Sequence, residues 1–177
     1  MKKILILHGW GGSNDPHWQY WLSKQLPNLG YDVLFPELTN KDYPNLLIWK
    51  EELEDILKNY KPNIVILHSL ANTLWMHILN SSKINVDTLL MVAPPNPVLD
   101  IFELMCFNTT KIPNYFGAKK GLMVASDNDI YFTKDGVEKL AKKMNIPLHI
   151  LENAGHINSD SGFGEWSWIL EWIKNNG

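Results

Sequence analysis

The feature that most constrains the fold of this chain is a regular alternation of short apolar runs with helical patterns. The runs are continuous in apolar and β-branched residues, as in parallel strands that are covered on both faces. We expect strands at residues 4–7, 33–35, 64–67, 88–93, 121–125 and 146–151. Helical patterns occur at residues 15–27, 45–60, 70–78, 99–107, 133–144 and 164–174. This alternation predicts an α/β fold with a mostly parallel sheet of about six strands and helices on both faces.

The length and composition limit what the chain can be. It has 177 residues with no repeat or linker, so we expect one domain over residues 1–177. The net charge is −3 and all 16 basic residues are Lys, which argues against a nucleic-acid partner. No stretch is long enough to span a membrane, and the first apolar run stops at His8, too early for a signal peptide. Cys106 has no partner for an internal disulfide, so we expect a cytoplasmic protein.

One strand runs directly into a serine. The apolar residues 64–67 are followed by His68-Ser69-Leu70 and then by a helical pattern. A strand, a sharp turn with Ser at its apex and a helix form the nucleophile elbow of serine hydrolases. The usual pattern is Gly-x-Ser-x-Gly, whereas Leu67 and Ala71 occupy the two Gly positions here. Ala71 is small enough for the close approach of strand and helix, whereas the bulky Leu67 could distort the elbow.

Other reactive residues also follow strands. His8-Gly9-Trp10 follows the first strand, Asp127 and Asp129 follow the fifth, and His156 follows the sixth. Parallel strands bring their carboxyl ends to one edge of the sheet, where ligands bind. With Ser69, these residues give the order Ser, Asp, His, which matches the needs of acyl transfer: a nucleophile, a base and a group that orients the base.

The residues alone leave alternatives open. Asp127 or Asp129 could be the acid, and either could instead simply form a turn. The other histidines compete with His156 for the base; they are His8, His17, His68, His77 and His149. We expect His68 to point away from Ser69 across the turn, and His77 and His149 to be structural. No H-x-x-x-H or C-x-x-C pattern is present, so no metal site and no cofactor are expected.

Four stretches together resemble the YdeN-like family of small serine hydrolases, which includes the retinoblastoma-binding-protein-9 relatives. They are Leu7-His-Gly-Trp-Gly-Gly12 with His17-Trp18-Gln19, Leu67-His-Ser-Leu70, Ala125-Ser-Asp-Asn-Asp129, and Gly155-His-Ile-Asn158 with Ser161-Gly-Phe-Gly-Glu-Trp166. The resemblance covers essentially the whole chain. It implies a minimal α/β-hydrolase fold with little or no cap domain.

The resemblance also implies roles for individual residues. Ser69 matches the nucleophile, His156 the base and Asp129 the acid. The family has a Pro-aromatic pair after this Asp, and Ile130-Tyr131 stands there in this chain. The backbone N–H groups of Trp10 and Leu70 match the donors to the oxyanion.

The expected substrate is a small molecule. His8, Gly9 and His68 flank the positions above, so we expect them to contact it. The leading hypothesis is a carboxylesterase that acts on small acyl esters; a thioesterase or an amidase is a weaker alternative. The rival from another class is a catalytically weak or inactive binding protein on a hydrolase scaffold. Residues 94–120 are expected to supply core residues and part of the substrate pocket. The sequence leaves a protein partner open and is compatible with a monomer or a small homo-oligomer.

Overall fold

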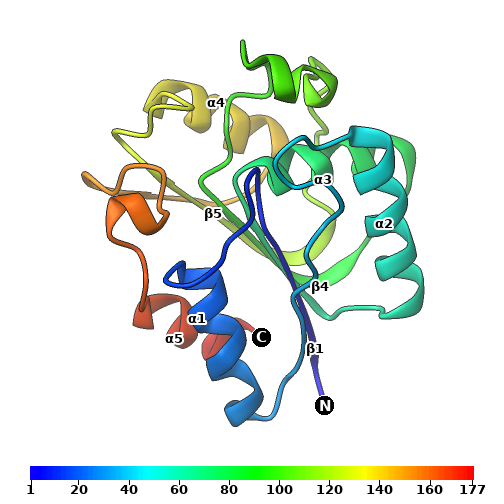
Figure 1. Ribbon diagram of the computed structural model, residues 1–177, viewed down its shortest axis with the longest axis vertical. Coiled ribbons are helices and arrows are strands. Elements are labelled where there is room, and N and C mark those ends of the chain that lie inside the picture. The colour runs from blue at the N-terminus through cyan, green and yellow to red at the C-terminus, as the bar shows by residue number, and fades with distance from the viewer.

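The computed structural model describes all 177 residues and contains one sheet of six strands. The strands are β1 (Lys3–Leu7), β2 (Asp32–Leu34), β3 (Ile64–His68), β4 (Val86–Val92), β5 (Ala118–Ser126) and β6 (Leu148–Leu151). They lie in the order β2-β1-β3-β4-β5-β6, and every neighbouring pair is parallel. Figure 1 shows the sheet crossing the molecule with helices on both sides. The prediction of a six-stranded parallel α/β sheet is therefore confirmed.

Helices connect the strands. The α-helices are α1 (Trp18–Gln25), α2 (Leu46–Asn59), α3 (Leu70–Ser81), α4 (Lys134–Met144) and α5 (Ser167–Asn176). Three short 3₁₀ helices are η1 (Leu26–Leu29), η2 (Phe102–Phe107) and η3 (Ser159–Ser161). None of the helices combines the length and the apolar character needed to cross a membrane.

Successive side chains of a strand point to opposite faces of the sheet, so the apolar residues of each strand are divided between two cores. In β1, Leu5 and Leu7 lie in a core with residues of α2, α3 and α4. Ile4 and Ile6 of the same strand point to the opposite face and pack with residues of α1 and α5. Because both faces are covered, the central strands β1 and β3 are apolar along almost their whole length rather than alternating with polar residues, as the sequence runs indicated.

The strand order creates a crevice. The chain leaves β1 for β2 on one side and returns to β3 on the other side of β1. In open parallel sheets, ligands bind at such a reversal, beyond the carboxyl ends of the strands. His8 follows β1 and Ser69 follows β3, so both lie at this point.

Several boundaries differ from those expected. Helix α1 begins at Trp18 rather than near Asp15, because His17 has an extended backbone and its ring accepts a hydrogen bond from Gln19 N–H as the N-cap. Strand β5 begins three residues earlier than expected, at Ala118, because its first residues pair with the start of β4. The helix expected over residues 99–107 is the shorter 3₁₀ helix η2. None of these shifts moves the carboxyl edge of the sheet.

Candidate active site

Ser69 occupies a strained turn between β3 and α3. Its backbone has φ 52° and ψ −124°, a conformation that costs a residue with a side chain of order 1–3 kcal/mol. The surroundings hold it there. Ser69 N–H donates to the carbonyl of Val92 at 3.1 Å, and the buried amide of Asn72 donates to the carbonyls of Ser69 and Val92, both at 2.9 Å. The elbow is therefore tied to the end of the neighbouring strand β4.

Close packing surrounds the elbow. A Cβ on Gly9 would lie 2.7 Å from Ser69 Cβ and 3.1 Å from Ser69 Oγ, so only glycine leaves room at that position. Leu67, which takes the place of the first Gly of the usual motif, is completely buried in the core and keeps the parallel register with Leu7 and Met91. Leu67 does not distort the elbow, because its side chain lies in the core and the turn at Ser69 stays sharp.

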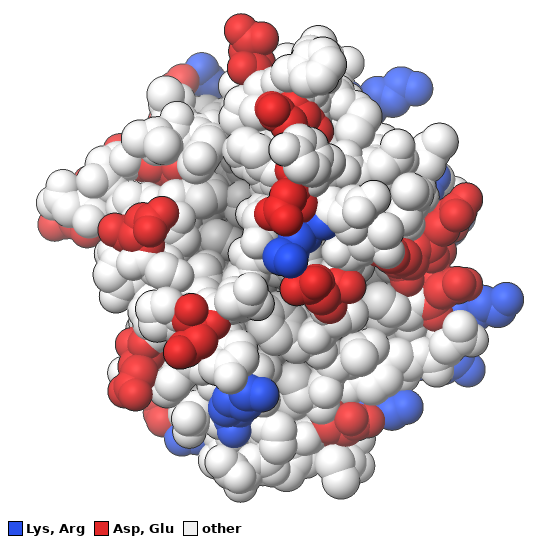
Figure 2. Space-filling view, viewed as in Figure 1, with Lys and Arg blue, Asp and Glu red and all other residues white.

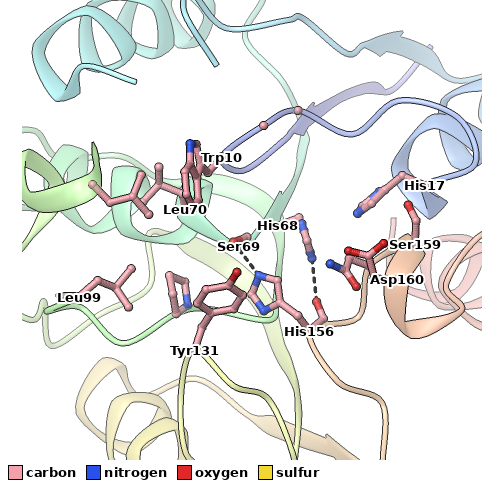
Figure 3. A pocket seen from close by; sticks show the side chains of 15 residues that line it. Trp10, His17, His68, Ser69, Leu70, Leu99, Tyr131, His156, Ser159 and Asp160 are labelled. Atoms are coloured by element: carbon pink, nitrogen blue, oxygen red, sulfur yellow. Dashed lines mark hydrogen bonds between the residues drawn. The ribbon is translucent and has the colours of Figure 1, made fainter. Parts of the chain in front are cut away.

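A chain of hydrogen bonds starts at Ser69. Its Oγ lies 2.8 Å from His156 Nε2, and His156 Nδ1 lies 2.8 Å from Asp129 Oδ2 (the first contact is drawn in Figure 3). The His156 and Asp129 side chains are only 9% and 3% exposed. A carboxylate that accepts from Nδ1 fixes the tautomer in which Nε2 can accept the hydroxyl proton. The other oxygen of Asp129 accepts from Tyr131 N–H at 2.9 Å.

The loops that carry Asp129 and His156 are bonded to each other. Asn128 Oδ1 accepts from Gly155 N–H and from the Ser126 hydroxyl, both at 2.7 Å. Ser126 Oγ in turn accepts from Ala154 N–H at 3.0 Å. These contacts set the separation of the two loops before any substrate binds.

Asp127 belongs to the same contact between loops. Its Oδ1 accepts from Asn153 N–H at 2.8 Å, and no hydrogen bond joins it to His156. The structure therefore distinguishes the two aspartates by their partners: Asp129 contacts the histidine ring and Asp127 contacts backbone.

The loop after β1 lies against the elbow and presents a backbone donor. Trp10 Nε1 donates to the carbonyl of Asp42 at 2.9 Å, and Gly11 N–H donates to the carbonyl of Lys41 at 2.9 Å. Trp10 N–H itself has no acceptor in the protein. Leu70 is the first residue of α3, so its N–H has no intrahelical acceptor either. Both groups are available to bind an anion, and the Leu70 group also lies at the positive end of the helix dipole.

A cleft of about 280 Å³ opens over Ser69. It is lined by the loop after β1, the elbow, the segment after β4, Tyr131 of the loop after β5, and the loop after β6. Figure 2 shows this face of the molecule hollowed near its centre, with acidic side chains around the hollow. Of the segment 94–120, only Pro95, Leu99 and Leu104 line the cleft. Phe107 is buried in the core, whereas Phe102 is 87% exposed, so this segment divides between pocket, core and surface.

Three histidines lie next to one another at the cleft. The rings of His17 and His68 are 4.9 Å apart between centroids, and those of His68 and His156 are 5.2 Å apart. Burial lowers the pKa of His68 well below its usual value, and the neighbouring His17 and His156 lower it further. Burial likewise lowers the pKa of His17 to about 4. His17 and His68 are therefore neutral at neutral pH, and His68 Nε2 is 3.1 Å from the His156 carbonyl, to which it can donate.

The chain matches the family model described as serine hydrolase over residues 4–175. It belongs to the serine hydrolase family. The expectation of a YdeN-like serine hydrolase is thus confirmed at the level of the family.

Among the relatives of this serine hydrolase is the Bacillus subtilis protein YdeN, which is 26% identical over 175 residues, 92% of this chain and 89% of YdeN. The crystal structure of YdeN superposes with a TM-score of 0.87 at 21% identity, covering 99% of this chain and 98% of that one. Est1E from Butyrivibrio proteoclasticus, solved with ferulic acid bound, gives a TM-score of 0.70 at 13% identity, covering 98% and 90%. These structures share the α/β-hydrolase fold, and the present chain has it without an obvious cap domain.

The remaining histidines of the serine hydrolase lie outside the hydrogen-bonded chain. His8 does not line the cleft over Ser69: it is 2% exposed, its Nε2 accepts from Leu38 N–H at 2.8 Å and its Nδ1 lies 2.7 Å from the Gly9 carbonyl. Burial lowers its pKa. Both ring nitrogens are occupied by backbone groups, so His8 has none free to contact a substrate, contrary to the expectation from the sequence. His77 contacts the Phe107 carbonyl through Nε2.

Gly9 and His68 differ in their relation to the cleft. Gly9 packs under Ser69 and is not among the residues that line the cleft. His68 lines it, and its ring points towards His156 rather than Ser69, as expected (Figure 3). Sequence reasoning missed Asn72 and Asn128, which hold the elbow and the loops. Their only signal was an amide three residues after Ser69 and another directly before Asp129, at spacings where such side chains often bond to backbone.

Proposed function

We propose that this protein is a carboxylesterase that hydrolyses small acyl esters through a triad of Ser69, His156 and Asp129. The observation that carries the proposal is the continuous hydrogen-bonded chain from Asp129 through His156 to a serine in a strained turn. The Ser69–His156 contact has the length that proton transfer needs, the Asp129–His156 contact orients the ring, and the nucleophile is held by the fold rather than by the substrate.

In the first half-reaction, Ser69 Oγ attacks the ester carbonyl while its proton passes to His156 Nε2. The carbonyl oxygen becomes an oxyanion, which accepts hydrogen bonds from the N–H groups of Trp10 and Leu70. Asp129 stabilises the imidazolium that forms. The tetrahedral intermediate then collapses, the bond to the leaving oxygen breaks, and His156 gives that oxygen its proton. An alcohol departs and the acyl group remains on Ser69.

In the second half-reaction, water replaces the alcohol. His156 takes a proton from the water as the water attacks the acyl-enzyme, and the same backbone donors hold the second oxyanion. Collapse releases the carboxylic acid and returns the proton to Ser69. No step needs a metal or an organic cofactor.

Labelling with a fluorophosphonate probe tests the activated nucleophile directly. Folded wild-type protein is expected to react, with the adduct mapped to the peptide that contains Ser69, and the Ser69→Ala variant is expected to stay unlabelled. Ser159→Ala is a matched control, because Ser159 also lines the cleft and contributes no link to the triad. A panel of p-nitrophenyl esters then measures turnover.

The rival binding-protein hypothesis makes the opposite prediction. Wild-type protein that is folded, unlabelled and inactive on the whole panel would overturn the carboxylesterase proposal in its favour. Labelling that persists in Ser69→Ala would show that another residue is the nucleophile.

A further inference from the structure

The cleft over Ser69 has two chemically different ends. One end is apolar and is formed by Leu70, Pro95, Leu99 and Leu104. The other end is polar and is formed by His17, Asn158, Ser159 and Asp160. Figure 3 shows Leu99 and Leu70 on one side of Ser69 and His17, Ser159 and Asp160 on the other. An elongated substrate bound over Ser69 therefore meets apolar side chains on one side of its reacting bond and hydrogen-bonding groups on the other.

The polar end contains donors that the protein itself does not use. His17 is 5% exposed and its Nδ1 accepts from Gln19 N–H at 3.1 Å. The ring is neutral at neutral pH, because burial lowers the pKa of His17 to about 4. Its proton therefore lies on Nε2, which has no partner in the protein. A buried ring with one nitrogen fixed by backbone and the other free at a cleft is positioned to donate to a ligand.

Asn158 adds a second free donor. Its Oδ1 accepts from the N–H of Ser161 at 3.1 Å and from the Ser161 hydroxyl at 2.9 Å. These contacts determine the orientation of the amide, so the Nδ2 group is the one left without a partner. Asp160 is exposed, forms no ion pair and can accept hydrogen bonds. Together these groups can both donate to and accept from a hydroxyl.

The position of His156 decides which part of an ester reaches the polar end. The leaving oxygen must lie beside His156, because it receives its proton from Nε2. His156 is in ring contact with His68, and His68 is in ring contact with His17, so the polar end continues from the His156 side of Ser69. The alcohol part of the ester extends towards His17 and Asn158, and the acyl part extends towards Leu99 and Leu104.

We infer that the alcohol portion of the natural substrate carries hydroxyl groups, which His17 Nε2–H, Asn158 Nδ2 and the Asp160 carboxylate bind. The substrate class is an acyl ester of a polyol with a short apolar acyl chain. This inference rests on the proposed esterase activity and assigns His17 and Asn158 as specificity-determining residues.

A matched pair of esters tests the inference. Glyceryl monobutyrate and n-propyl butyrate have the same acyl group, and the alcohols that leave both have three carbon atoms. The two esters differ only in the two free hydroxyls of the glyceryl group. Both form the same butyryl-enzyme, so the ratio of their kcat/KM values reports the acylation step alone. We expect the polyol ester to be favoured by about tenfold or more, as two neutral hydrogen bonds would give.

Two conservative variants localise the preference. In His17→Asn the side chain can still cap α1 but no longer reaches the cleft, and in Asn158→Asp the oxygen that binds Ser161 is retained while the free donor is lost. Each is expected to lower the ratio by about three- to tenfold, mainly through KM of the polyol ester. His149→Asn, the same substitution at an exposed position on β6, should leave the ratio unchanged. A purely structural role of His17 would slow both esters equally and keep the ratio.

The outcomes separate this inference from the proposed function. Turnover of p-nitrophenyl butyrate with a ratio near one, or a ratio that neither variant changes, would overturn the polyol inference and leave the esterase proposal standing. Folded protein without activity on any of the three esters would overturn both.

Discussion

The substitution Gly9→Ala tests how closely the loop after β1 and the nucleophile turn depend on each other. Gly9 does not have a positive φ, so alanine is compatible with its backbone conformation and any effect must come from the added methyl group. That Cβ would lie 2.7 Å from Ser69 Cβ and 3.2 Å from the His68 carbonyl oxygen. Carbon atoms in contact lie about 3.5–4.0 Å apart, so Ser69 or the loop must move by about 1 Å. Neither neighbour is the flexible end of a side chain.

The size of the expected loss follows from that displacement. A shift of about 1 Å in a reacting group costs of order 100-fold in rate, and kcat/KM on p-nitrophenyl butyrate should fall by about that factor. Overpacking costs about 1–3 kcal/mol, and the reduced entropy of the unfolded chain offsets about 0.4–1 kcal/mol of it. The free energy of unfolding should therefore fall by roughly 0–2.5 kcal/mol, which leaves the protein folded.

Gly121→Ala is the matched control for this substitution. Its Cβ would meet the Phe116 ring at 2.8 Å, in β5 and away from the cleft, and this neighbour is a partly exposed side chain that can turn aside. Urea denaturation should show a loss of stability for Gly121→Ala that is no larger than the loss for Gly9→Ala, and only Gly9→Ala should lose activity and react more slowly with the fluorophosphonate. Activity of Gly9→Ala within about threefold of the wild type would refute the steric argument.

Three further predictions follow from the contacts of the candidate site. Asp129→Asn should lower kcat by about 10³–10⁴-fold because the amide no longer fixes the His156 tautomer, whereas Asp127→Asn should stay within about tenfold in the same ester assay. Asn128→Ala should lower kcat about tenfold and the free energy of unfolding by about 1–3 kcal/mol, because it leaves the Ser126 hydroxyl and Gly155 N–H without their acceptor. Asn128→Asp keeps an acceptor oxygen and should restore most of the activity. Equal losses in both variants would contradict this explanation. Between pH 6.5 and about 4 the unfolded chain binds a proton at His17 that the folded protein excludes, so the free energy of unfolding falls as the pH falls. Denaturation curves of His17→Asn should show this loss reduced by at most about 3 kcal/mol. An unchanged pH dependence in the variant would refute the lowered pKa of His17.

Tertiary contacts distinguish two aspartates that the sequence alone leaves equivalent as partners of the catalytic histidine candidate. Asp127 and Asp129 both follow β5, and either could have been the acid. Their side chains take different directions in an irregular loop, where no fixed period applies, and only the position of the loop after β6 determines which one meets His156. His8 follows β1 directly, a position that predicts a place in the site, yet its ring is hydrogen-bonded to the backbone of Leu38 and Gly9.

The sequence by itself determined the framework. Continuous apolar runs separated by helices require a parallel sheet covered on both faces. Because Ser69, Asp129 and His156 each follow a strand, parallel strands bring all three to the same edge of the sheet. The tertiary structure decided the site itself: the packing of Gly9 under Ser69, the bonding between the loops, and a cleft with one apolar and one polar end. The physical reason is that strands and helices repeat along the chain and leave a local pattern. The direction of a loop side chain, in contrast, depends on partners far away in the sequence, such as His68 and His156, which lie 88 positions apart.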